Sequence, residues 1–505
     1  MTTPSEKLAE SLDILHAIQA QGAVALRSAD LSRTHRERLT KNGFLREVIK
    51  GWYIASKPDN STGESTAWYS SFWGFCAAYL NHLKGDKWVL SPEQSLHLHV
   101  DNRTVPKQLL VRSEKARNNI TKLLFETSLL DIRAKLPDKA NIILKENLRI
   151  YSLSAALIAC APGFFPQNPT ETRAALAMIK DAADILGPLL DGGHSVIAGR
   201  LAGAFRNISR NDIADNILQT MRSAGYNVRE SDPFETASPV TLSKREQSPY
   251  VNRMKLMWQT MRGVVIDHFP APLKQAVDID TYLKHVEEVY ITDAYHSLSI
   301  EGYKVSGELI ERVRSGEWQP NTNPNDAEHS NALAARGYWQ AHKAVKYSIR
   351  KIMSGDNPGQ VVKSDLGEWY NELFAPSVVA GILRPSDLAG YRNHPVYIRH
   401  STHVPPSREI VRDAMPALYE LLAEEEIASV RAILGHFMFV YIHPFMDGNG
   451  RIGRFLMNSM LASGGHSRCC RQNVENAYLC GLLHNIGIPV ALHGLQAIAD
   501  SHGTP

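Results

Sequence analysis

The chain has 505 residues, enough for about two to four domains, and 44% of them are hydrophobic, so full cores can form. The net charge of +3 gives no global attraction to nucleic acid or to a membrane, so any such contact must come from a local patch. The five cysteines are scattered without a CxxC pair, which favours a reduced, cytoplasmic chain over a disulfide framework. The N-terminus lacks a basic start followed by an apolar run, and the longest apolar runs are too short to span a bilayer. We therefore expect neither a signal peptide nor a membrane partner.

Residues 1–56 are predicted to form a winged helix-turn-helix. An amphipathic first helix is followed by Ser32, which is placed to cap a second helix over Arg33 to Lys41. Asn42-Gly43 ends that helix, and two short strands follow around Lys50-Gly51. Helix, helix and hairpin in this order are typical of a winged helix.

The second predicted helix and the hairpin carry a group of basic side chains. In a winged helix this group indicates a recognition helix for the major groove of DNA. The cations that we expect to contact DNA are Arg33, Arg36, Arg38, Lys41 and Arg46. Winged helices also bind proteins, so a protein-docking surface is the alternative. Because winged-helix DNA binders are often dimers, a homodimer is also an open expectation.

The rest of the chain divides into a middle domain, a linker and a C-terminal domain. Residues 59–229 mix helical stretches with short apolar runs, which predicts an α/β domain of unknown role. Residues 230–250 are rich in Ser, Pro, Thr and charge and are predicted to be a linker. Residues 251–499 are mostly helical by periodicity, apart from a strand-turn-strand pattern over Leu388 to Pro406. The fold class expected for the whole chain is therefore mainly α.

One string of residues carries recognisable chemistry: His443 to Arg454 reads HPFMDGNGRIGR. The apolar helix before it should end at His443, because proline disfavours helical geometry in the residue that precedes it. The DGNG segment needs small or left-handed residues, and a helix resumes at Arg451. The loop therefore lies at a helix N-terminus, where free N–H groups and the helix dipole favour an anion such as phosphate.

The polar residues of this string suit a nucleotide phosphate site. His443 is the candidate general base, and Asp447 is a hard oxygen ligand suited to Mg²⁺. Arg451 and Arg454 lie on one helix face and can each bind phosphate oxygens. A capped helix-loop-helix with surface arginines is the structural alternative, but the complete string in this order favours the phosphate site.

The same string resembles the motif of the Fic (Fido) family, HxFx(D/E)GNGRxxR, at every defined position. The resemblance extends from near Asp278 to Ala499. It implies a helical bundle with a β-hairpin flap that transfers AMP from Mg-ATP to a Ser, Thr or Tyr hydroxyl of a target protein. It assigns the base to His443 and the Mg²⁺ ligand to Asp447.

The resemblance also assigns the remaining site residues. Those assigned to nucleotide binding are Gly448, Asn449, Gly450, Arg451, Arg454, Tyr478 and Asn485. Those assigned to the flap that docks a target segment are Val396, Tyr397, Ile398 and Arg399. The segment around Asn485 departs from the acidic turn usual in the family, and Tyr478 has a core aromatic as its alternative role.

A second resemblance predicts a built-in brake on a helix near residues 282–302. Ser297, Glu301 and Gly302 match the Fic inhibitory motif, (S/T)xxxE(G/N). A glutamate facing Arg454 would form a bidentate ion pair and occupy the donors meant for the γ-phosphate. An ordinary solvated glutamate at a helix end is the alternative. In some Fic proteins the same glutamate helps water to remove AMP, and the sequence leaves open whether this chain also de-AMPylates.

Arg33 to Ile54 and, more loosely, the middle block resemble AbiEi-type antitoxin proteins, which repress their own operons. This resemblance implies a transcription-regulating or toxin–antitoxin setting. The main hypothesis is an autoinhibited protein adenylyltransferase with a DNA-binding or docking front end. A Doc-like kinase is an alternative, although intact Gly450 and Arg454 favour AMP transfer. A regulator that only senses nucleotide is another, although it would have no need of the base His443.

Overall fold

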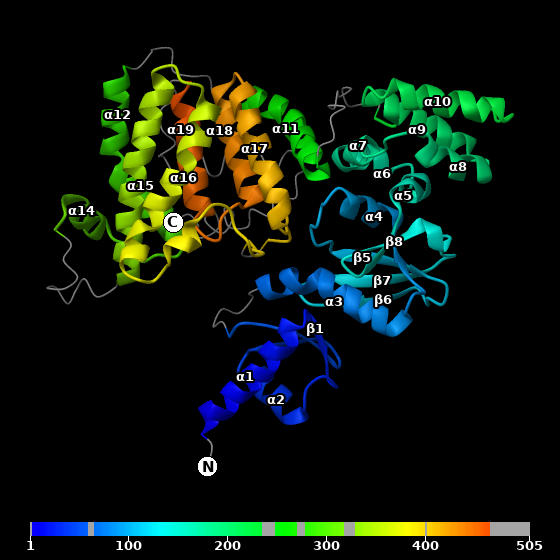
Figure 1. Cartoon of the computed structure of the whole chain (residues 1–505), viewed down its shortest axis with the longest axis horizontal. Coiled ribbons are helices and arrows are strands. Elements are labelled where there is room, and N and C mark those ends of the chain that lie inside the picture. The colour runs from blue at the N-terminus through cyan, green and yellow to red at the C-terminus, as the bar shows by residue number, and fades with distance from the viewer. Residues whose placement is uncertain are drawn as a thin grey trace, which may run out of the picture. The chain divides into compact units, whose positions relative to one another are not determined.

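The computed structural model describes residues 3–58, 65–234, 248–269, 278–317, 329–398 and 401–464, and these residues are mainly helical (Figure 1). The chain forms two compact units. The first contains Met1–Arg253 and Tyr397–Val404, and the second contains Met254–Val396 and Pro405–Pro505. Residues 235–247 of the predicted linker lie outside the described residues.

The front of the first unit has the element order expected from its sequence, with one added strand. It contains α1 (Pro4–Ala20), β1 (Ala25–Arg27), α2 (Arg33–Lys41), β2 (Leu45–Ile49) and β3 (Trp52–Ala55). The hydroxyl of Ser32 accepts a hydrogen bond from the His35 N–H, which confirms the predicted cap of α2. Gly51, with φ +80°, makes the turn between β2 and β3, so the predicted hairpin is also confirmed. The unpredicted β1 pairs antiparallel with β3 and completes the sheet order β1-β3-β2.

The rest of the first unit combines a mixed sheet with helices, as the sequence predicted. Its first half contains α3 (Thr66–Lys84), β4 (Val89–Leu90), α4 (Pro92–His99), β5 (Gln108–Ser113), β6 (Asn119–Lys122), β7 (Ser128–Arg133), β8 (Ile142–Lys145) and β9 (Leu148–Tyr151). The second half contains α5 (Leu153–Ala159), α6 (Phe164–Gln167), α7 (Pro169–Ala177), α8 (Ala183–Asp191), α9 (Ser195–Asn207) and α10 (Asn211–Ser223). The sheet order is β4-β5-β7-β6, with β5 and β7 parallel, and β8 and β9 form a separate antiparallel pair.

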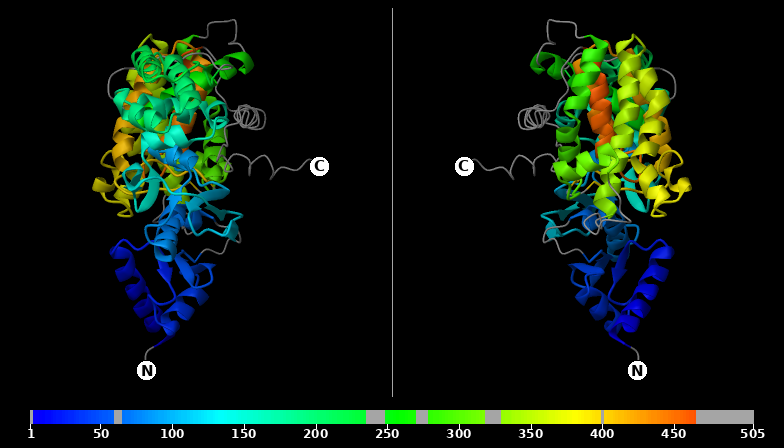
Figure 2. Two further views of the ribbon diagram at one scale, coloured as in Figure 1. Left: turned by 90° about the vertical axis from the view of Figure 1, so that its right-hand side faces the viewer. Right: turned by 90° about the vertical axis from the view of Figure 1, so that its left-hand side faces the viewer.

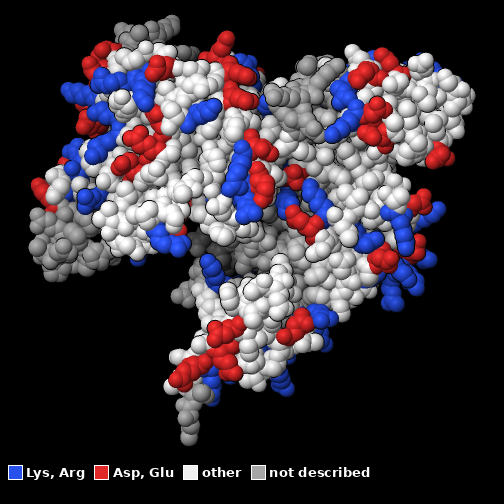
Figure 3. Space-filling model, in the orientation of Figure 1, with Lys and Arg blue, Asp and Glu red and all other residues white. Residues whose placement is uncertain are grey.

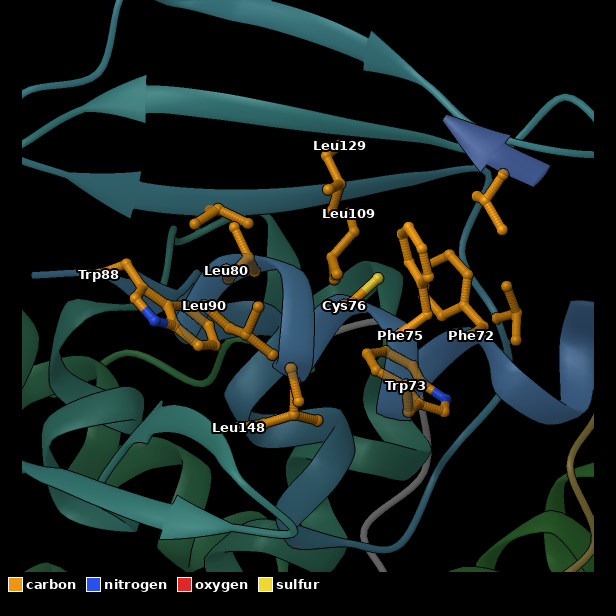
Figure 4. Packing of buried hydrophobic residues seen from close by; sticks show 14 of the residues in the cluster. Phe72, Trp73, Phe75, Cys76, Leu80, Trp88, Leu90, Leu109, Leu129 and Leu148 are labelled. Carbon is orange, nitrogen blue, oxygen red and sulfur yellow. The ribbon is translucent and has the colours of Figure 1, made fainter. Parts of the chain in front are cut away.

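The core of this unit forms between α3 and the four-stranded sheet. Figure 4 shows Phe72, Phe75 and Cys76 of α3 on the side of the strands that carry Leu109 and Leu129. All five side chains are buried, and rings along α3 meet edge to face, as in the pair Trp68–Phe72 at 5.4 Å between centroids. Apolar burial of this extent accounts for a stable α/β unit without any disulfide.

The second unit is a helical bundle. Its helices are α11 (Pro249–His268), α12 (Ile279–Glu288), α13 (Tyr290–Ile300), α14 (Gly307–Ser315), α15 (His329–Met353), α16 (Pro358–Val379), α17 (Arg408–Glu424), α18 (Ala428–Ile442) and α19 (Asn449–Ala462). Helix α19 packs against α15, α16 and α18, and most of its residues are buried. Figure 2 shows it (orange-red) flanked by other helices of the bundle. None of the described helices combines the length and the apolar character needed to cross a lipid bilayer.

The predicted strand-turn-strand over Leu388 to Pro406 is not present in its described residues. A short 3-10 turn, Pro385–Leu388, leads into irregular chain over residues 389–398 and 401–406. Pro395, Pro405 and Pro406 lack a main-chain N–H, so an antiparallel ladder would lose donors on both sides of the turn. Alternating side chains suggested strands here, but the prolines favour an irregular path.

Helices α15 and α16 approach so closely that only glycine fits at one position. A Cβ atom added to Gly337 of α15 would collide with the main-chain carbonyl of Leu373 in α16. Phe374, the next residue of α16, lies beside Gly448. A Cβ atom added to Gly448 would be 2.9 Å from the Phe374 ring. The packing of these two helices therefore sets the position of a side chain at the candidate site.

We expect Gly337→Ala to lower the stability of the second unit by about 1–3 kcal/mol, because main chain rather than a flexible side chain must move. The matched control is Gly367→Ala in α16, where no described atom lies within 4 Å of the added Cβ. That change should raise stability by about 0.5–1 kcal/mol, since alanine favours a helix interior. Thermal unfolding midpoints measure both effects. Equal midpoints for the two variants would contradict the close approach of α15 and α16.

Candidate functional site

The candidate site begins where α18 ends at His443. This helix is almost fully buried, and His443 terminates it in the left-handed conformation, with φ 53° and ψ 61°. The His443 N–H still donates to the Phe439 carbonyl, at 2.9 Å. A left-handed conformation at a non-glycine residue is strained and persists only where neighbouring contacts hold it. The predicted helix end at His443 is thus confirmed, and the chain turns sharply there.

The loop after His443 is closed by the side chain of Asn449. Its Oδ1 accepts from the Phe445 N–H, and its Nδ2 donates to the Phe445 carbonyl, both at 2.9 Å. Asn449 is 2% exposed, so this amide is committed to the loop and does not face a ligand. Phe445 stacks on Tyr370 with 3.9 Å between ring centroids, which holds the loop against α16. The predicted nucleotide contact of Asn449 is therefore limited to its main chain.

An anion site forms at the N-terminus of α19, which starts at Asn449, two residues before the predicted Arg451. Gly448 precedes it in the left-handed conformation, with φ +74°. The first N–H groups of a helix have no acceptors within the helix, so they attract negative charge. A Cβ at Gly450 would collide with Oε1 of Glu301, so the absence of a side chain leaves room for a carboxylate above the first turn.

The hydrogen bond of His443 assigns its protons. Nδ1 lies 3.2 Å from the Val440 carbonyl, which can only accept, so Nδ1 carries the proton and Nε2 keeps its lone pair. Burial, together with the neighbouring Arg392 guanidinium, lowers the pKa of His443 to about 4, although the Val440 carbonyl and the carboxylates of Glu301 and Asp447 raise it. His443 is consequently neutral at pH 7 and able to accept a proton.

Asp447 has the chemistry of a Mg²⁺ ligand. Its Oδ1 accepts from the Gly448 N–H at 2.6 Å, and its Oδ2 lies 3.5 Å from Arg451. Its side chain is 64% exposed, so a cation can reach the carboxylate. Mg²⁺ is commonly bound by one or two carboxylates together with phosphates and water. Within the described residues no group of three acidic, His or Cys side chains could hold a metal alone, so the donor set fits Mg²⁺ shared with a substrate.

Arg451 is placed differently from the sequence prediction. Its side chain is buried, with 1% of the residue exposed, between the rings of Tyr303 at 5.3 Å and Phe374 at 5.1 Å. One terminal nitrogen is directed at Asp447, and Nε has no hydrogen-bond partner within the described residues. In this conformation Arg451 supports the loop and the candidate metal ligand and is covered from phosphate by Tyr303. The phosphate contact predicted for it requires that Tyr303 move.

Arg454 is held by the helix that the sequence predicted to be inhibitory. Its Nε donates to the Ser297 hydroxyl at 2.8 Å, and a terminal nitrogen donates to the Ser297 carbonyl at 3.1 Å. The same nitrogen forms an ion pair with Oε1 of Glu301 at 2.8 Å. Glu301 caps α13, and Gly302 follows with φ +84°, as predicted for a helix stop. All three residues of the predicted inhibitory motif thus lie at the site.

The charge state of Glu301 follows from this pair. Burial alone would raise the pKa of its carboxyl, but Arg454, with help from Arg451 and His443, holds that pKa below its usual range. The carboxylate is therefore ionised at neutral pH. The side chains of Arg454 and Glu301 are 19% and 25% exposed, so solvent screens their attraction less than at an open surface.

The predicted target-docking residues are divided between the units. Val396 belongs to the second unit, while Tyr397 and Ile398 belong to the segment that clusters with the first. These three residues are not in a strand. Arg399 lies outside the described residues, as do the predicted nucleotide contacts Tyr478 and Asn485.

Two of the cations predicted to contact DNA are engaged inside the front part of the first unit. Arg38 donates to the Lys7 carbonyl at 2.6 Å and to the Ser11 hydroxyl at 2.8 Å, so it fastens α2 to α1. Arg36 donates to the Ser28 carbonyl at 2.6 Å. Neither guanidinium is free to contact phosphate or a base edge without losing these bonds. Both side chains therefore contribute to packing in this structure, and their contact with DNA stays a prediction.

The other three predicted DNA contacts differ in their exposure and in their neighbours. Arg46 lies 5.6 Å from the centroid of the Phe125 ring. Arg33 is exposed but paired with Glu37 at 2.7 Å, and Lys41 is exposed. On the face shown in Figure 3, Lys and Arg side chains are interspersed with Asp and Glu. The front part therefore offers Arg33 and Lys41 as the exposed members of the predicted set.

Three site residues were not identified from the sequence: Tyr303, Phe374 and Arg392. Tyr303 stands directly after the predicted Glu301-Gly302 helix stop, so its place beside the site was within reach of local reasoning. Phe374 comes from the middle of α16, and no local pattern links it to the loop. Arg392 lies within the predicted strand-turn-strand, but its burial depends on contacts with residues about fifty positions away in sequence.

Comparison with known proteins supports the resemblance seen in the sequence. Residues 362–461 match the model of the Fic/DOC family. A protein adenylyltransferase Fic from Nematostella vectensis is 28% identical over 184 residues, which cover 36% of this chain and 39% of the relative. Proteins of the same name from Culex quinquefasciatus and Drosophila grimshawi are 31% identical over 193 residues and 28% identical over 237 residues. The first covers 37% of this chain and 35% of the relative, and the second 45% of each. The chain thus spans less than half the length of these relatives.

Solved structures of similar proteins include Fic-1 from C. elegans, with a TM-score of 0.30 and 16% identity over 66% of this chain and 97% of that chain. A Fic family protein from Desulfovibrio desulfuricans has a TM-score of 0.29 and 19% identity over 47% of this chain and 79% of that chain.

We expect His443 to titrate with a pKa of about 4 in the folded protein. Its C2 proton resonance, assigned by its absence in His443→Ala, measures this value. An unfolded histidine titrates near pH 6.5. The neutral imidazole therefore contributes stability that is complete above about pH 6.5 and is lost as pH falls through about 4. A resonance that titrates near pH 6.5 would mean that His443 is not buried as described.

Proposed function

We propose that the chain is a protein adenylyltransferase that moves AMP from Mg-ATP to a Ser, Thr or Tyr hydroxyl of a target protein, because residues 362–461 match the Fic/DOC family model. One observation carries this proposal: the Nε2 lone pair of His443 is available at the edge of an anion site, the N-terminus of α19. A base beside a phosphate site is the arrangement that phosphoryl transfer to a hydroxyl requires.

In the proposed reaction, residues of the loop and of α19 act on the target hydroxyl and on ATP. His443 Nε2 accepts the proton of the target hydroxyl while its oxygen forms a bond to the α-phosphorus of ATP. The bond from that phosphorus to the bridging oxygen breaks, and pyrophosphate leaves with the electron pair. The N–H groups of α19 and the guanidinium of Arg454 stabilise the phosphate charge. Mg²⁺ bound to Asp447 would neutralise part of the triphosphate charge.

Two alternatives remain distinguishable from this proposal. A Doc-like kinase would transfer the terminal phosphate instead, but Gly450 and Arg454 are both present, which supports AMP transfer. A regulator that only senses nucleotide would need no base, whereas His443 has a fixed tautomer with an available lone pair. The proposed function therefore depends on which phosphorus is attacked, and labelled ATP tests that directly.

We also propose that the activity is autoinhibited in cis by α13. Glu301 and Ser297 occupy the donors of Arg454, and the carboxylate of Glu301 lies above the first turn of α19, where a phosphate would bind. Tyr303 of the same segment covers Arg451. Two arginines suited to phosphate are thus engaged by residues within one stretch of seven positions. Release of α13 would free both.

The DNA-binding front end is retained as a proposal that depends on the exposed residues Arg33 and Lys41. The order of α1, α2 and the β2–β3 hairpin supports it, and a protein-docking role is its alternative. De-AMPylation, a homodimer and a cytoplasmic location stay predictions from the sequence.

ATP labelled at either the α- or the γ-phosphate distinguishes the candidate reactions, with self-modification as a readout that needs no target. We expect label on protein from the α-position alone. His443→Ala should lower the transfer rate by about 10²-fold or more, while ATP affinity stays within a few fold. Transfer of the γ-label would identify a kinase. Full activity of His443→Ala would refute its role as base.

The brake predicts that Glu301→Gly raises the rate of self-modification. A hydrogen bond between charged groups is worth about 1.5–3 kcal/mol, so its loss should increase the rate about tenfold to a hundredfold. Tyr303→Ala should raise the rate by a smaller factor, because it uncovers Arg451 but leaves the ion pair of Glu301 in place. Glu308→Gln, an exposed change on the neighbouring α14, is the control and should leave the rate unchanged. If Glu301→Gly is no faster than this control, the inhibitory role of α13 is wrong.

A further inference from the structure

Arg392 is a buried arginine whose described hydrogen bonds go to main-chain carbonyl oxygens. It is 2% exposed. Nε donates to the His443 carbonyl at 2.7 Å, and one terminal nitrogen donates to the Pro406 carbonyl at 2.5 Å. Longer contacts reach the carbonyls of His394 at 3.3 Å and Ile442 at 3.5 Å. A guanidinium with donors in a fixed plane is well suited to bind several carbonyls at once.

Two of these carbonyls belong to the candidate base and to the residue before it. Ile442 and His443 supply the last carbonyls of α18. No N–H group of the helix donates to these oxygens, so they favour a cation. The Arg392 N–H adds a bond to the Pro444 carbonyl at 2.9 Å. Arg392 thus contacts three successive residues across the point where His443 adopts its left-handed conformation. Strain at such a residue is maintained only by contacts of this kind.

The same guanidinium also fixes both ends of the segment predicted to dock a target. His394 stands before that segment and Pro406 after it, and both carbonyls accept from Arg392. One side chain therefore links the base loop to residues before and after that segment.

We propose that Arg392 is a positioning residue for the transfer reaction, which holds His443 and its imidazole in place at the end of α18. This inference rests on the proposed adenylyltransferase function. Arg392 contacts the main chain on both sides of His443, so its loss should displace the base and affect the transfer step more than ATP binding. Misplacement of a reacting group by about 1 Å can slow a reaction about a hundredfold.

The test uses the full chain with the activating change Glu301→Gly as the parent. Arg392→Met keeps the length of the side chain but removes its donors, and Arg392→Lys keeps one charged donor group. The control is Arg412→Met, because Arg412 donates to Asn393, the residue next to Arg392, and makes no described contact with the base loop. Each variant is measured for the maximal rate of self-modification, for the KM for ATP and for ATP affinity.

We expect Arg392→Met to lower the maximal rate by about a hundredfold, with the KM for ATP and ATP affinity within about twofold of the parent. Arg392→Lys should fall between Arg392→Met and the parent, and Arg412→Met should match the parent. A maximal rate for Arg392→Met equal to that of the control would overturn the proposal. A loss of ATP affinity in Arg392→Lys as large as its loss of maximal rate would also overturn it. If Arg392→Met fails to bind ATP because it is unfolded, Arg392→Lys decides by the same criteria.

A second readout separates this inference from the proposed function. The C2 proton resonance of His443 reports its surroundings without any turnover. We expect it to shift in Arg392→Lys and to stay unchanged in Arg412→Met. An inactive parent in which the resonance shifts as expected would refute the adenylyltransferase assignment but support the positioning of His443. An active parent in which neither the resonance nor the rate responds to Arg392→Lys would refute the positioning role alone.

Discussion

The site depends on one electrostatic constraint, the concentration of positive charge at the start of α19. Arg454 and the first N–H groups of the helix converge there, and this charge requires a negative partner. In the present structure that partner is Glu301, which is why α13 lies where it does. A second contact holds α13 at a point away from this charge: the hydroxyl of Tyr338 donates to Asp293 of α13 at 2.9 Å. The bundle that forms the site therefore also holds α13 beside it.

Steric constraints determine the shape of the site as much as charge does. Gly337 lets the main chains of α15 and α16 approach each other closely, and this brings Phe374 against Gly448. Phe374 in turn covers one face of Arg451. The loop is then closed by Asn449 on Phe445, so its geometry does not depend on a bound ligand. A preformed loop is what positioning of a phosphate requires, because little order has to be gained on binding.

The sequence predicted those parts of the fold and site that depend on local rules. The cap at Ser32, the helix end at His443 and the stop at Gly302 follow from backbone preferences of single residues, and each is confirmed. The contacts of Arg38 and Arg451 were not predicted, because a basic side chain on a helix does not reveal which carbonyls or rings from distant elements lie beside it. The same holds for Arg392, whose partners lie far along the chain.

An inhibitory contact made within one chain has a thermodynamic consequence. In the proposed autoinhibited enzyme, α13 is present at high effective concentration, and ATP and α13 compete for the same donors. The proposed resting activity is then proportional to the small fraction of molecules in which α13 is displaced. Any change that weakens its docking far from the nucleotide, such as loss of the Tyr338–Asp293 bond, would raise this fraction. Under this proposal, basal activity and sensitivity to ATP both depend on the docking of one helix.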